Sequence, residues 1–255
     1  MTLDGILNLD KPAGISSARA VDQVKRLLPR KTKIGHAGTL DPFATGVLVL
    51  LIGKGTKSCE RLMDQPKQYE ATIKFGTTTA TDDPESAEEA WVPKRGLGVP
   101  PERLSAATDG RTPGQDAQAT MEEVRAVLPR FVGAIQQRPP AFSAMKIDGQ
   151  RAYKLARGGE EVKLEPRTVQ VYEIELLEFA WPLLRVRIDC GRGTYIRSIA
   201  RDLGEVLDVG GHLTQLRRTR VGEFTIESAV TLERLRADGL ERHLLPLQVD
   251  TTPQG

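Results

Sequence analysis

The sequence contains few of the residues that build metal centres or disulfide frameworks. Its 255 residues include only two cysteines and three histidines, and these residues, Cys59, Cys190, His36, His212 and His243, show none of the spacings of zinc or iron sites. No glycine-rich loop ends in Gly-Lys-Ser/Thr. We therefore expect chemistry without a metal, a nucleotide or another cofactor. The two distant cysteines and the lack of a secretory signal predict a reduced, cytoplasmic protein.

The sequence also lacks a long hydrophobic run. The longest candidate is Val47–Ile52, which glycines flank on both sides, whereas a membrane helix needs roughly 20 apolar residues. We therefore expect a soluble protein that has no membrane partner. With 39% hydrophobic residues, the chain can bury a substantial core as one large domain or two ordinary ones.

The small net charge of +2 hides a strong division of charge along the chain. Residues 1–81 carry 12 Lys and Arg against 7 Asp and Glu, residues 82–123 carry 4 against 10, and residues 124–220 carry 17 against 11. Two basic stretches separated by an acidic one are typical of local attraction to a nucleic acid. A solvated surface of mixed charge explains the composition equally well.

Hydrophobic periodicity predicts strands and helices that do not alternate regularly. This arrangement indicates an α+β fold, in which a mixed, mostly antiparallel β-sheet carries flanking helices. The predicted strands are 5–9, 47–52, 69–75, 168–179, 183–190 and 213–221, with a further short strand within 136–159. The predicted helices are 16–29, capped by Ser16 or Ser17, 122–132, 151–157 and 195–207. Residues 30–46 are predicted to be a loop. Residues 76–118, rich in polar and acidic residues, are predicted to be a flexible surface insertion with at most a short helix.

The most distinctive local feature is the run from Gly35 to Gly46, which contains three glycines and the dipeptide Asp41-Pro42. Glycines allow a close approach of the backbone to a ligand, and proline fixes the chain directly after the aspartate. This pattern is suited to holding Asp41 rigidly as a reactive group. An ordinary Asp-Pro turn is the simpler explanation of the dipeptide taken alone.

The run 35–46 closely resembles the catalytic loop of the bacterial TruB family of tRNA pseudouridine synthases. Further segments resemble that family in the same order along the chain: 9–17, Tyr69 at the head of its strand, 138–146, 193–199 and 216–218. The resemblance spans residues 5–220. It implies the pseudouridine synthase fold and an isomerase that converts the T-loop uridine at tRNA position 55 to pseudouridine.

The resemblance also implies a catalytic group of three residues. Asp41 matches the family's nucleophile or base. Arg197 matches the arginine that pairs with this aspartate, and such a pair would keep a carboxylate ionised in a dry pocket. Tyr69 would stack on the flipped uracil and carry a proton. Without the resemblance, core packing is the simpler explanation of Tyr69. For Arg197 the alternative is an ordinary surface ion pair, which the apolar neighbours in 195–199 disfavour because they suggest burial.

Four residues are implied to bind the substrate together with Tyr69. His36 would fill the gap that the flipped base leaves, and Tyr195 and Leu216 would shape the opposite wall of the pocket. Lys11 would support the site or a phosphate. An exposed histidine and core packing of Tyr195 and Leu216 remain the alternatives.

The resemblance places a segment that closes over RNA at residues 131–160. Its basic residues would contact RNA phosphates, which makes binding salt-dependent. A solvated helix face is the alternative. The implied phosphate contacts are Lys146, Arg151, Lys154 and Arg157.

The chain is predicted to be one catalytic domain over residues 1–255, with no room for the C-terminal PUA domain that many family members carry. The expected partner is the T-arm of tRNA, the expected state is a monomer, and no guide RNA is expected. Two alternatives stay open: a non-catalytic RNA-binding or RNA-folding module, and a synthase directed by a separate guide RNA.

Overall fold

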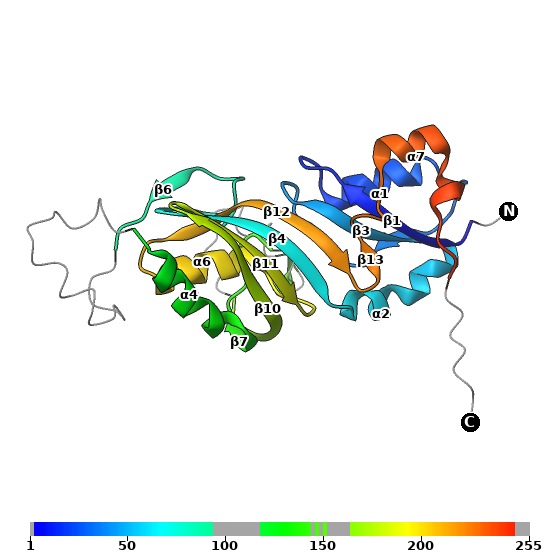
Figure 1. Ribbon diagram of the computed structural model, residues 1–255. Helices are drawn as coiled ribbons and strands as arrows, with labels where there is room; N and C mark the ends of the chain where they lie inside the picture. Colours follow the sequence, from blue (N-terminus) through cyan, green and yellow to red (C-terminus); the bar gives the residue numbers. More distant parts are fainter. Residues whose placement is uncertain (1–2, 94–117, 144–145, 148–149, 152–163, 248–255) are drawn as a thin grey trace, which may run out of the picture. The chain divides into compact units, whose positions relative to one another are not determined.

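The structure of the protein is a computed structural model that describes residues 3–93, 118–143, 146–147, 150–151 and 164–247 (Figure 1). The chain divides into two compact units. Unit 1 comprises Met1–Tyr69 and Arg217–Gly255, and unit 2 comprises Glu70–Leu216. The division falls within strands β4 (Lys67–Phe75) and β12 (Gly211–Val221), so each of these strands contributes residues to both units.

Unit 1 is built around strand β3, whose residues Val47 to Ile52 are completely buried. The strand order is β14-β1-β3-β12, in which β1 and β3 are antiparallel, β3 and β12 are parallel, and β1 and β14 are parallel. A central strand that has neighbours on both edges and is covered on both faces requires the continuous apolar run that the sequence contains. The elements of this unit, besides β4 and β12, are β1 (Gly5–Lys11), α1 (Ser17–Lys25), β2 (Ile34–His36), β3 (Thr45–Ile52), η1 (Gly53–Ser58), α2 (Cys59–Asp64), β13 (Phe224–Thr225), β14 (Val230–Thr231), α7 (Leu232–Asp238) and η4 (Leu240–His243).

Helix α1 begins where the sequence predicts and ends earlier. The Ser16 side chain accepts a hydrogen bond from the N–H of Arg19 at 3.2 Å, which confirms Ser16 as the N-cap. The helix ends at Lys25, and Leu28 then bonds back to the Lys25 carbonyl in a tighter turn. The prediction that the helix continues to Pro29 was wrong, because a residue that precedes proline disfavours the helical conformation.

The predicted loop 30–46 contains a short strand that the sequence analysis missed. Residues Ile34–His36 form β2, which pairs antiparallel with β3 from Ile34 opposite Ile52 to His36 opposite Leu50. Three residues are too few to show a period, so only the tertiary partner reveals this strand.

Unit 2 continues β12 and β4 into the order β12-β4-β11-β10-β7, in which β11, β10 and β7 pair antiparallel. Helix α6 packs closely against the start of β12, since a Cβ atom on Gly204 would lie 2.3 Å from the carbonyl carbon of Gly210. The other elements of this unit are β5 (Thr77–Thr79), β6 (Glu88–Ala90), α4 (Met121–Val127), η3 (Leu128–Phe131), β7 (Gly133–Gln137), β8 (Lys146–Ile147), β9 (Gln150–Arg151), β10 (Arg167–Ala180), β11 (Leu183–Cys190) and α6 (Ile196–Val206).

Three predictions for unit 2 need correction. The predicted helix 122–132 is α4 followed by the 3-10 helix η3, which contains Pro129. The predicted surface insertion 76–118 begins with a β5–β6 hairpin, and residues 94–117 lie outside the described residues. The predicted helix 151–157 is wrong at Arg151, which belongs to β9 and pairs with Lys146 in β8. The rest of that predicted helix lies outside the described residues.

The predicted fold class is confirmed. The main sheet is mixed and mostly antiparallel, with its parallel pairs β1/β14 and β3/β12 in unit 1, and helices accompany it in both units (Figure 1). The six strands predicted with bounds are present, with boundaries shifted by a few residues, and β8 lies within 136–159, where a further short strand is predicted. In the described part of the chain, no helix has the length and hydrophobicity that crossing a membrane requires.

Candidate active site

Asp41 lies in unit 1 on a tight loop, residues 37–46, which we call the Asp41 loop. The loop begins where the N–H of Ala37 donates to the Val49 carbonyl at 2.9 Å, and it ends at Gly46 on β3. Within it, the N–H of Ala44 donates to the carbonyl of Asp41 at 3.2 Å. The Asp41 side chain is half-buried. The loop therefore holds Asp41 on a turn that is tied at both ends to the buried central strand.

The backbone on both sides of Asp41 is anchored to the segment 11–17. The buried Ser17 hydroxyl accepts a hydrogen bond from the N–H of Leu40 at 2.8 Å and donates one to the Leu40 carbonyl at 2.9 Å. The carbonyl of Pro42 accepts from the N–H of Gly14 at 2.9 Å. A carboxylate fixed in this way has few backbone conformations open to it, as a catalytic group requires.

Lys11 is completely buried and joins the same anchor. Its ammonium donates to the carbonyls of Pro12 at 2.8 Å, Ile15 at 2.7 Å and Pro42 at 3.3 Å. An ammonium that is committed to three carbonyls inside the protein favours support of the Asp41 loop over contact with a phosphate.

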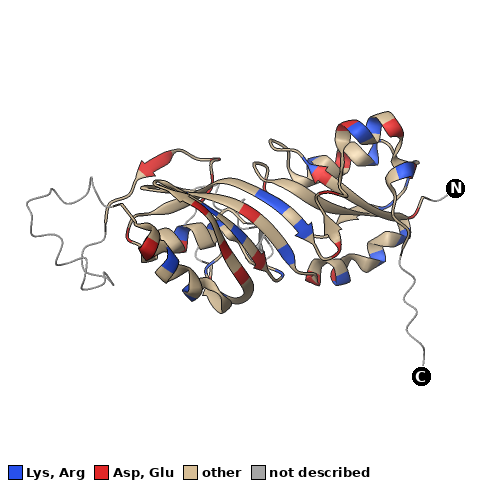
Figure 2. Cartoon of the chain, viewed as in Figure 1, with Lys and Arg blue, Asp and Glu red and all other residues tan. Residues whose placement is uncertain are grey.

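A buried arginine that the sequence analysis left without a role completes the loop contacts. The side chain of Arg218 is among the largest fully buried side chains. It donates to the carbonyls of Val47 at 2.7 Å, Gly38 at 3.1 Å and Thr39 at 3.4 Å. The only signal in the sequence is the pair Arg217-Arg218, which gives no hint that one guanidinium is buried. Figure 2 shows Lys and Arg positions along this later part of β12.

His36 and Tyr69 both lie within reach of the Arg218 charge. Burial, and secondarily the nearby Arg218 guanidinium, lower the pKa of the half-buried His36 below its ordinary value, so the imidazole is neutral at pH 7. Its Nδ1 atom is buried and has no hydrogen-bond partner among the described residues. The Tyr69 ring is 8% exposed, and its centroid lies 6.0 Å from Cζ of Arg218.

In unit 2, Arg197 forms a buried ion pair with Asp83. The Nη1–Oδ2 distance is 3.1 Å, and the two side chains are 4% and 2% exposed. The guanidinium also donates to the carbonyls of Thr81 and Phe142, each at 3.0 Å. Asp83 was missed because it lies in the stretch predicted to be a surface insertion, where Asp82-Asp83-Pro84 is the only signal. The predicted pair of Arg197 with Asp41 joins residues of different units and stays a prediction.

A second ion pair lies beside the first. Arg201 binds Asp82 at 2.9 Å and Asp202 at 2.8 Å. Burial raises the pKa of Asp82 to about 6, and the neighbouring Arg201 and Arg197 only partly oppose this rise. Asp82 therefore titrates in the mildly acidic range.

Tyr195 and Leu216 also lie in unit 2. Tyr195 is the N-cap residue of α6 and is half-buried. Its backbone is held by the Gln137 side-chain amide, which accepts from the Tyr195 N–H at 2.8 Å and donates to its carbonyl at 3.0 Å. The Arg167 guanidinium lies over the Tyr195 ring, 5.1 Å from its centroid. Leu216 is buried in β12. No pattern in the sequence indicated this role of Gln137.

The predicted phosphate contacts are placed only in part. Lys146 and Arg151 are backbone partners in the β8–β9 hairpin, and their side chains lie outside the described part. Lys154 and Arg157 lie outside the described residues altogether. All four assignments stay predictions.

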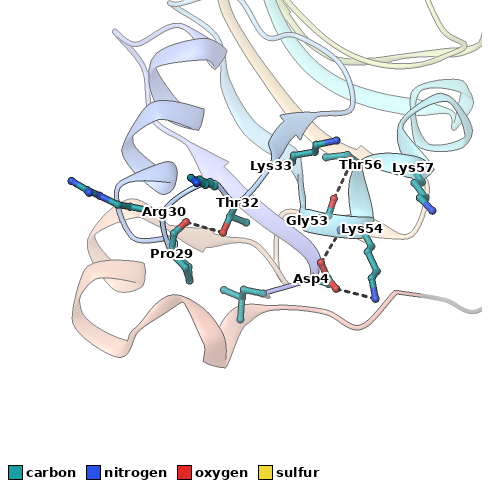
Figure 3. Close-up of a pocket in the computed structure, with 11 residues that line it drawn as sticks. Asp4, Pro29, Arg30, Thr32, Lys33, Gly53, Lys54, Thr56 and Lys57 are labelled. Atoms are coloured by element: carbon teal, nitrogen blue, oxygen red, sulfur yellow. Dashed lines mark hydrogen bonds and ion pairs between the residues drawn. The ribbon is translucent and has the colours of Figure 1, made fainter. Parts of the chain in front are cut away.

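The structure reveals a cationic surface in unit 1 that the sequence analysis did not single out. A cavity of about 440 Å³ lies between the loop before β2, the 3-10 helix η1 and the start of the chain (Figure 3). One carboxylate, Asp4, lines it and lies 3.7 Å from Lys54. The cationic residues that line this basic pocket are Arg30, Lys31, Lys33, Lys54 and Lys57.

Two models of known protein families match the sequence of this chain. A model of the TruB family pseudouridylate synthase (N terminal domain) matches residues 25–96 and 102–196. The chain belongs to the TruB family. A model of the tRNA pseudouridylate synthase B C-terminal domain matches residues 197–249. The resemblance on which the sequence analysis relied is thereby confirmed, and so is the prediction of an isomerase.

Curated relatives extend the TruB match over nearly the whole chain. "tRNA pseudouridine synthase B" of Aromatoleum aromaticum is 40% identical over 99% of this chain and 79% of that protein. The protein of the same name from Corynebacterium diphtheriae is 45% identical over 91% of this chain and 72% of that protein. The one from Phocaeicola vulgatus is 42% identical over 89% of this chain and 90% of that protein.

Solved structures show the same fold. The structure of a Cbf5-Nop10-Gar1 complex matches with a TM-score of 0.66 and 28% identity over 95% of this chain. The structure of an H/ACA RNP bound to a substrate RNA containing 2'-deoxyuridine matches with a TM-score of 0.61 and 27% identity over 95% of this chain. The chain spans 60% and 59% of the matched chains in these structures.

Proposed function

We propose that this protein isomerises the uridine at position 55 in the T-loop of tRNA to pseudouridine, with Asp41 as the catalytic carboxylate. The observation that carries the proposal is the Asp41 loop. Its backbone is hydrogen-bonded at Leu40 and Pro42, directly before and after Asp41, while the Asp41 side chain stays half-buried. The names of the curated relatives, at 40% to 45% identity, support tRNA as the substrate.

The reaction needs no external group. The bond from N1 of the base to C1' of ribose breaks, the detached base turns, and a bond from C5 to C1' forms. C5 then loses its proton and N1 gains one, so that atoms and charge balance. We infer that Asp41 acts as nucleophile or base at the sugar or its neighbouring proton. A rigidly held carboxylate suits this role because the reacting atoms must stay aligned through bond cleavage and rotation of the base.

The need to flip the base out of its stack suggests roles for the remaining predicted residues. The uridine must leave its stack to reach a carboxylate, which costs a few kcal/mol and needs apolar surfaces to receive the base. We infer that Tyr69 stacks on the uracil, and that Tyr195 and Leu216 form the opposite wall. His36 would fill the gap in the RNA. A neutral imidazole suits this role, since it is less costly to insert between stacked bases than a charged one.

Arg197 is inferred to pair with Asp41. Its guanidinium is held by Asp83 and two carbonyls, so its position is fixed before RNA arrives. Arginine keeps its charge when buried and presents several donors in one plane. These donors suit a guanidinium that binds the Asp41 carboxylate in addition to Asp83.

The basic pocket offers a described surface for the RNA backbone. Five cations face one carboxylate around the cavity, and phosphates are the natural counter-charge for such a surface. With the four predicted phosphate contacts at Lys146, Arg151, Lys154 and Arg157, we expect RNA affinity to fall steeply as salt concentration rises. We infer a monomer that works in the cytoplasm, where it meets tRNA.

A guide-RNA-dependent synthase is the second candidate, because the matched solved structures come from a Cbf5 complex and an H/ACA RNP. Their identity of 27% to 28% is well below the 40% to 45% of the relatives named tRNA pseudouridine synthase B. We therefore favour a free-standing enzyme.

The test is tritium release from an unmodified tRNA transcript labelled at C5 of uridine, with purified protein and no other RNA. Wild type should release tritium, and a transcript with cytidine at position 55 should not support release. Asp41→Asn should bind the transcript and release no tritium. Equal release by the variant would remove Asp41 from the mechanism. No release by the wild type without an added guide RNA would favour the second candidate.

A further inference from the structure

We propose that Arg218 is a positioning residue, which holds the Asp41 loop in the conformation that catalysis requires. This inference rests on the proposed catalytic role of Asp41. Arg218 touches no substrate in this assignment, because its side chain is almost completely buried inside unit 1. It acts through the backbone that carries Asp41.

The guanidinium bridges the two ends of the loop. Gly38 and Thr39 lie on the way into the turn, and Val47 follows directly after it. The carbonyl oxygen of each residue accepts a hydrogen bond from the Arg218 side chain. The guanidinium is planar and rigid, so three donors in one plane fix the relative positions of the three carbonyls. A lysine ammonium could hold one side of the loop at full strength and would leave the other side less constrained.

The main chain of Arg218 packs on the end of the same loop. Arg218 in β12 pairs with Gly46 in β3. Gly46 has a φ of +101°, and a Cβ atom there would lie 2.2 Å from the Arg218 carbonyl oxygen. The loop therefore ends against the backbone of the residue whose side chain closes its base.

Stability alone does not explain a charge at this position. Among the described residues, no Asp or Glu oxygen lies within 4.0 Å of the Arg218 guanidinium, whereas the neighbouring Arg217 lies 2.9 Å from Asp10. Burying a guanidinium without a carboxylate is expensive, and apolar residues of similar volume often stabilise a core better. The contacts of the Arg218 guanidinium indicate the role of its charge, which is to bind backbone carbonyls at both ends of the Asp41 loop.

The same guanidinium reaches two other residues to which we assign substrate contacts. Its charge contributes to the lowered pKa of His36. The Tyr69 ring lies 6.0 Å away, within the range of a cation–π contact. One buried side chain thus connects the Asp41 loop, His36 and Tyr69.

The test compares Arg218→Lys and Arg218→Gln with the matched control Arg217→Lys. Single-turnover rates of tritium release and dissociation constants for the tRNA transcript are measured for each folded variant. We expect Arg218→Lys to slow turnover about 100-fold, as a small misplacement of a catalytic group does, while the dissociation constant changes less than about threefold. Arg217→Lys should change both quantities less than about threefold, because its ion pair is partly exposed.

A spectroscopic readout separates charge from geometry. In an NMR titration, the pKa of His36 should rise in Arg218→Gln, which removes the positive charge, and should stay low in Arg218→Lys, which keeps it. Both variants should lose turnover, since neither presents the guanidinium fork. Loss of turnover in the Gln variant alone would show that charge, and not positioning, is what Arg218 supplies, and would overturn the inference.

Other outcomes also decide the question. A folded Arg218→Lys that turns over within threefold of wild type would refute positioning, and so would a loss of RNA affinity equal to the loss of rate. If both Arg218 variants fail to fold while Arg217→Lys folds, Arg218 serves stability and the inference is overturned. Asp41→Asn is measured in parallel. If it turns over normally, the proposed function loses its catalytic residue; if it is inactive and Arg218→Lys is normal, only the positioning inference fails.

Discussion

The two units bury their central cations in different ways. In unit 1, Arg218 is surrounded by backbone carbonyls, with no carboxylate within ion-pair distance in the described part of the chain. In unit 2, Arg197 shares its charge with the buried carboxylate of Asp83. The first arrangement holds a backbone in place, and the second holds a charged side chain in place. The difference fits the inferred tasks: unit 1 must fix the loop of Asp41, and unit 2 must present a guanidinium.

The comparison predicts different costs when each arrangement is broken. Removing a cation from carbonyls leaves neutral groups without partners, whereas removing a carboxylate leaves an uncompensated buried charge.

Asp83→Leu should destabilise the protein most. It leaves Arg197 without its buried partner, and breaking a buried ion pair costs about 3–5 kcal/mol. Urea unfolding measures the change. The control is Glu178→Gln, which removes an exposed partner of Arg185 and should cost about 0–1 kcal/mol. A loss of less than 1 kcal/mol in Asp83→Leu would mean that Arg197 finds another anion, and the contrast between the units would disappear.

Asp82 should make the stability of the protein depend on pH in the acidic range. Its pKa of about 6 in the folded protein lies above its ordinary value of 3.8. The folded state therefore binds the Asp82 proton more tightly than the unfolded state does. The contribution of this proton to the free energy of unfolding is complete below pH 3.8 and is lost as the pH rises through about 6. Relative to Asp82→Asn, wild type should lose up to about 3 kcal/mol between these limits. Unfolding curves at several pH values test this, and parallel curves for the two proteins would refute the shift.

Lys11→Met should have an intermediate effect. Three carbonyls lose a donor, which costs about 2 kcal/mol in total, while the apolar side chain fills the same buried space. Because Lys11 is inferred to support the loop, the variant should bind the tRNA transcript within about threefold of wild type, a change below 1 kcal/mol. A much larger loss of affinity at unchanged stability would show that Lys11 contacts the RNA.

The smallest effects are expected for Ser17→Ala and its matched control Ser16→Ala, which remove the same hydroxyl group at adjacent positions. Ser17 satisfies the N–H and the carbonyl of Leu40, next to Asp41, and its loss should cost about 2 kcal/mol. Ser16 caps helix α1, and its loss should cost about 1 kcal/mol. At a temperature at which both variants are folded, only Ser17→Ala should slow tritium release. Equal turnover by the two variants would mean that the anchor at Leu40 is dispensable.

Much of the fold could be predicted from the sequence, for local reasons. The apolar run 47–52 predicted a buried strand because a central strand shows only hydrophobic side chains, and Ser16 predicted the start of α1 because few residues can cap a helix. Elements that depend on a distant partner were missed or misassigned. Strand β2 exists because β3 offers it an edge, and Arg151 is in a strand because Lys146 pairs with it.

The candidate site divides in the same way. The glycine-rich sequence around Asp41-Pro42, and its resemblance to a known family, were enough to propose the catalytic residue and the residues that we expect to act with it. No pattern in the sequence showed that Arg218 is buried under the loop, that Asp83 pairs with Arg197, or that Gln137 holds Tyr195. These side chains bind groups 58 to 180 positions away along the chain.

The family, the fold class and the turn that carries Asp41 could be predicted without coordinates, because motifs, hydrophobic periods, caps and glycine turns are patterns of neighbouring residues. Which cations are buried, and which groups compensate each charge, became known only from the folded chain. The cost of burying a charge depends on the groups that folding brings within about 4 Å of it, and those groups are remote in the sequence.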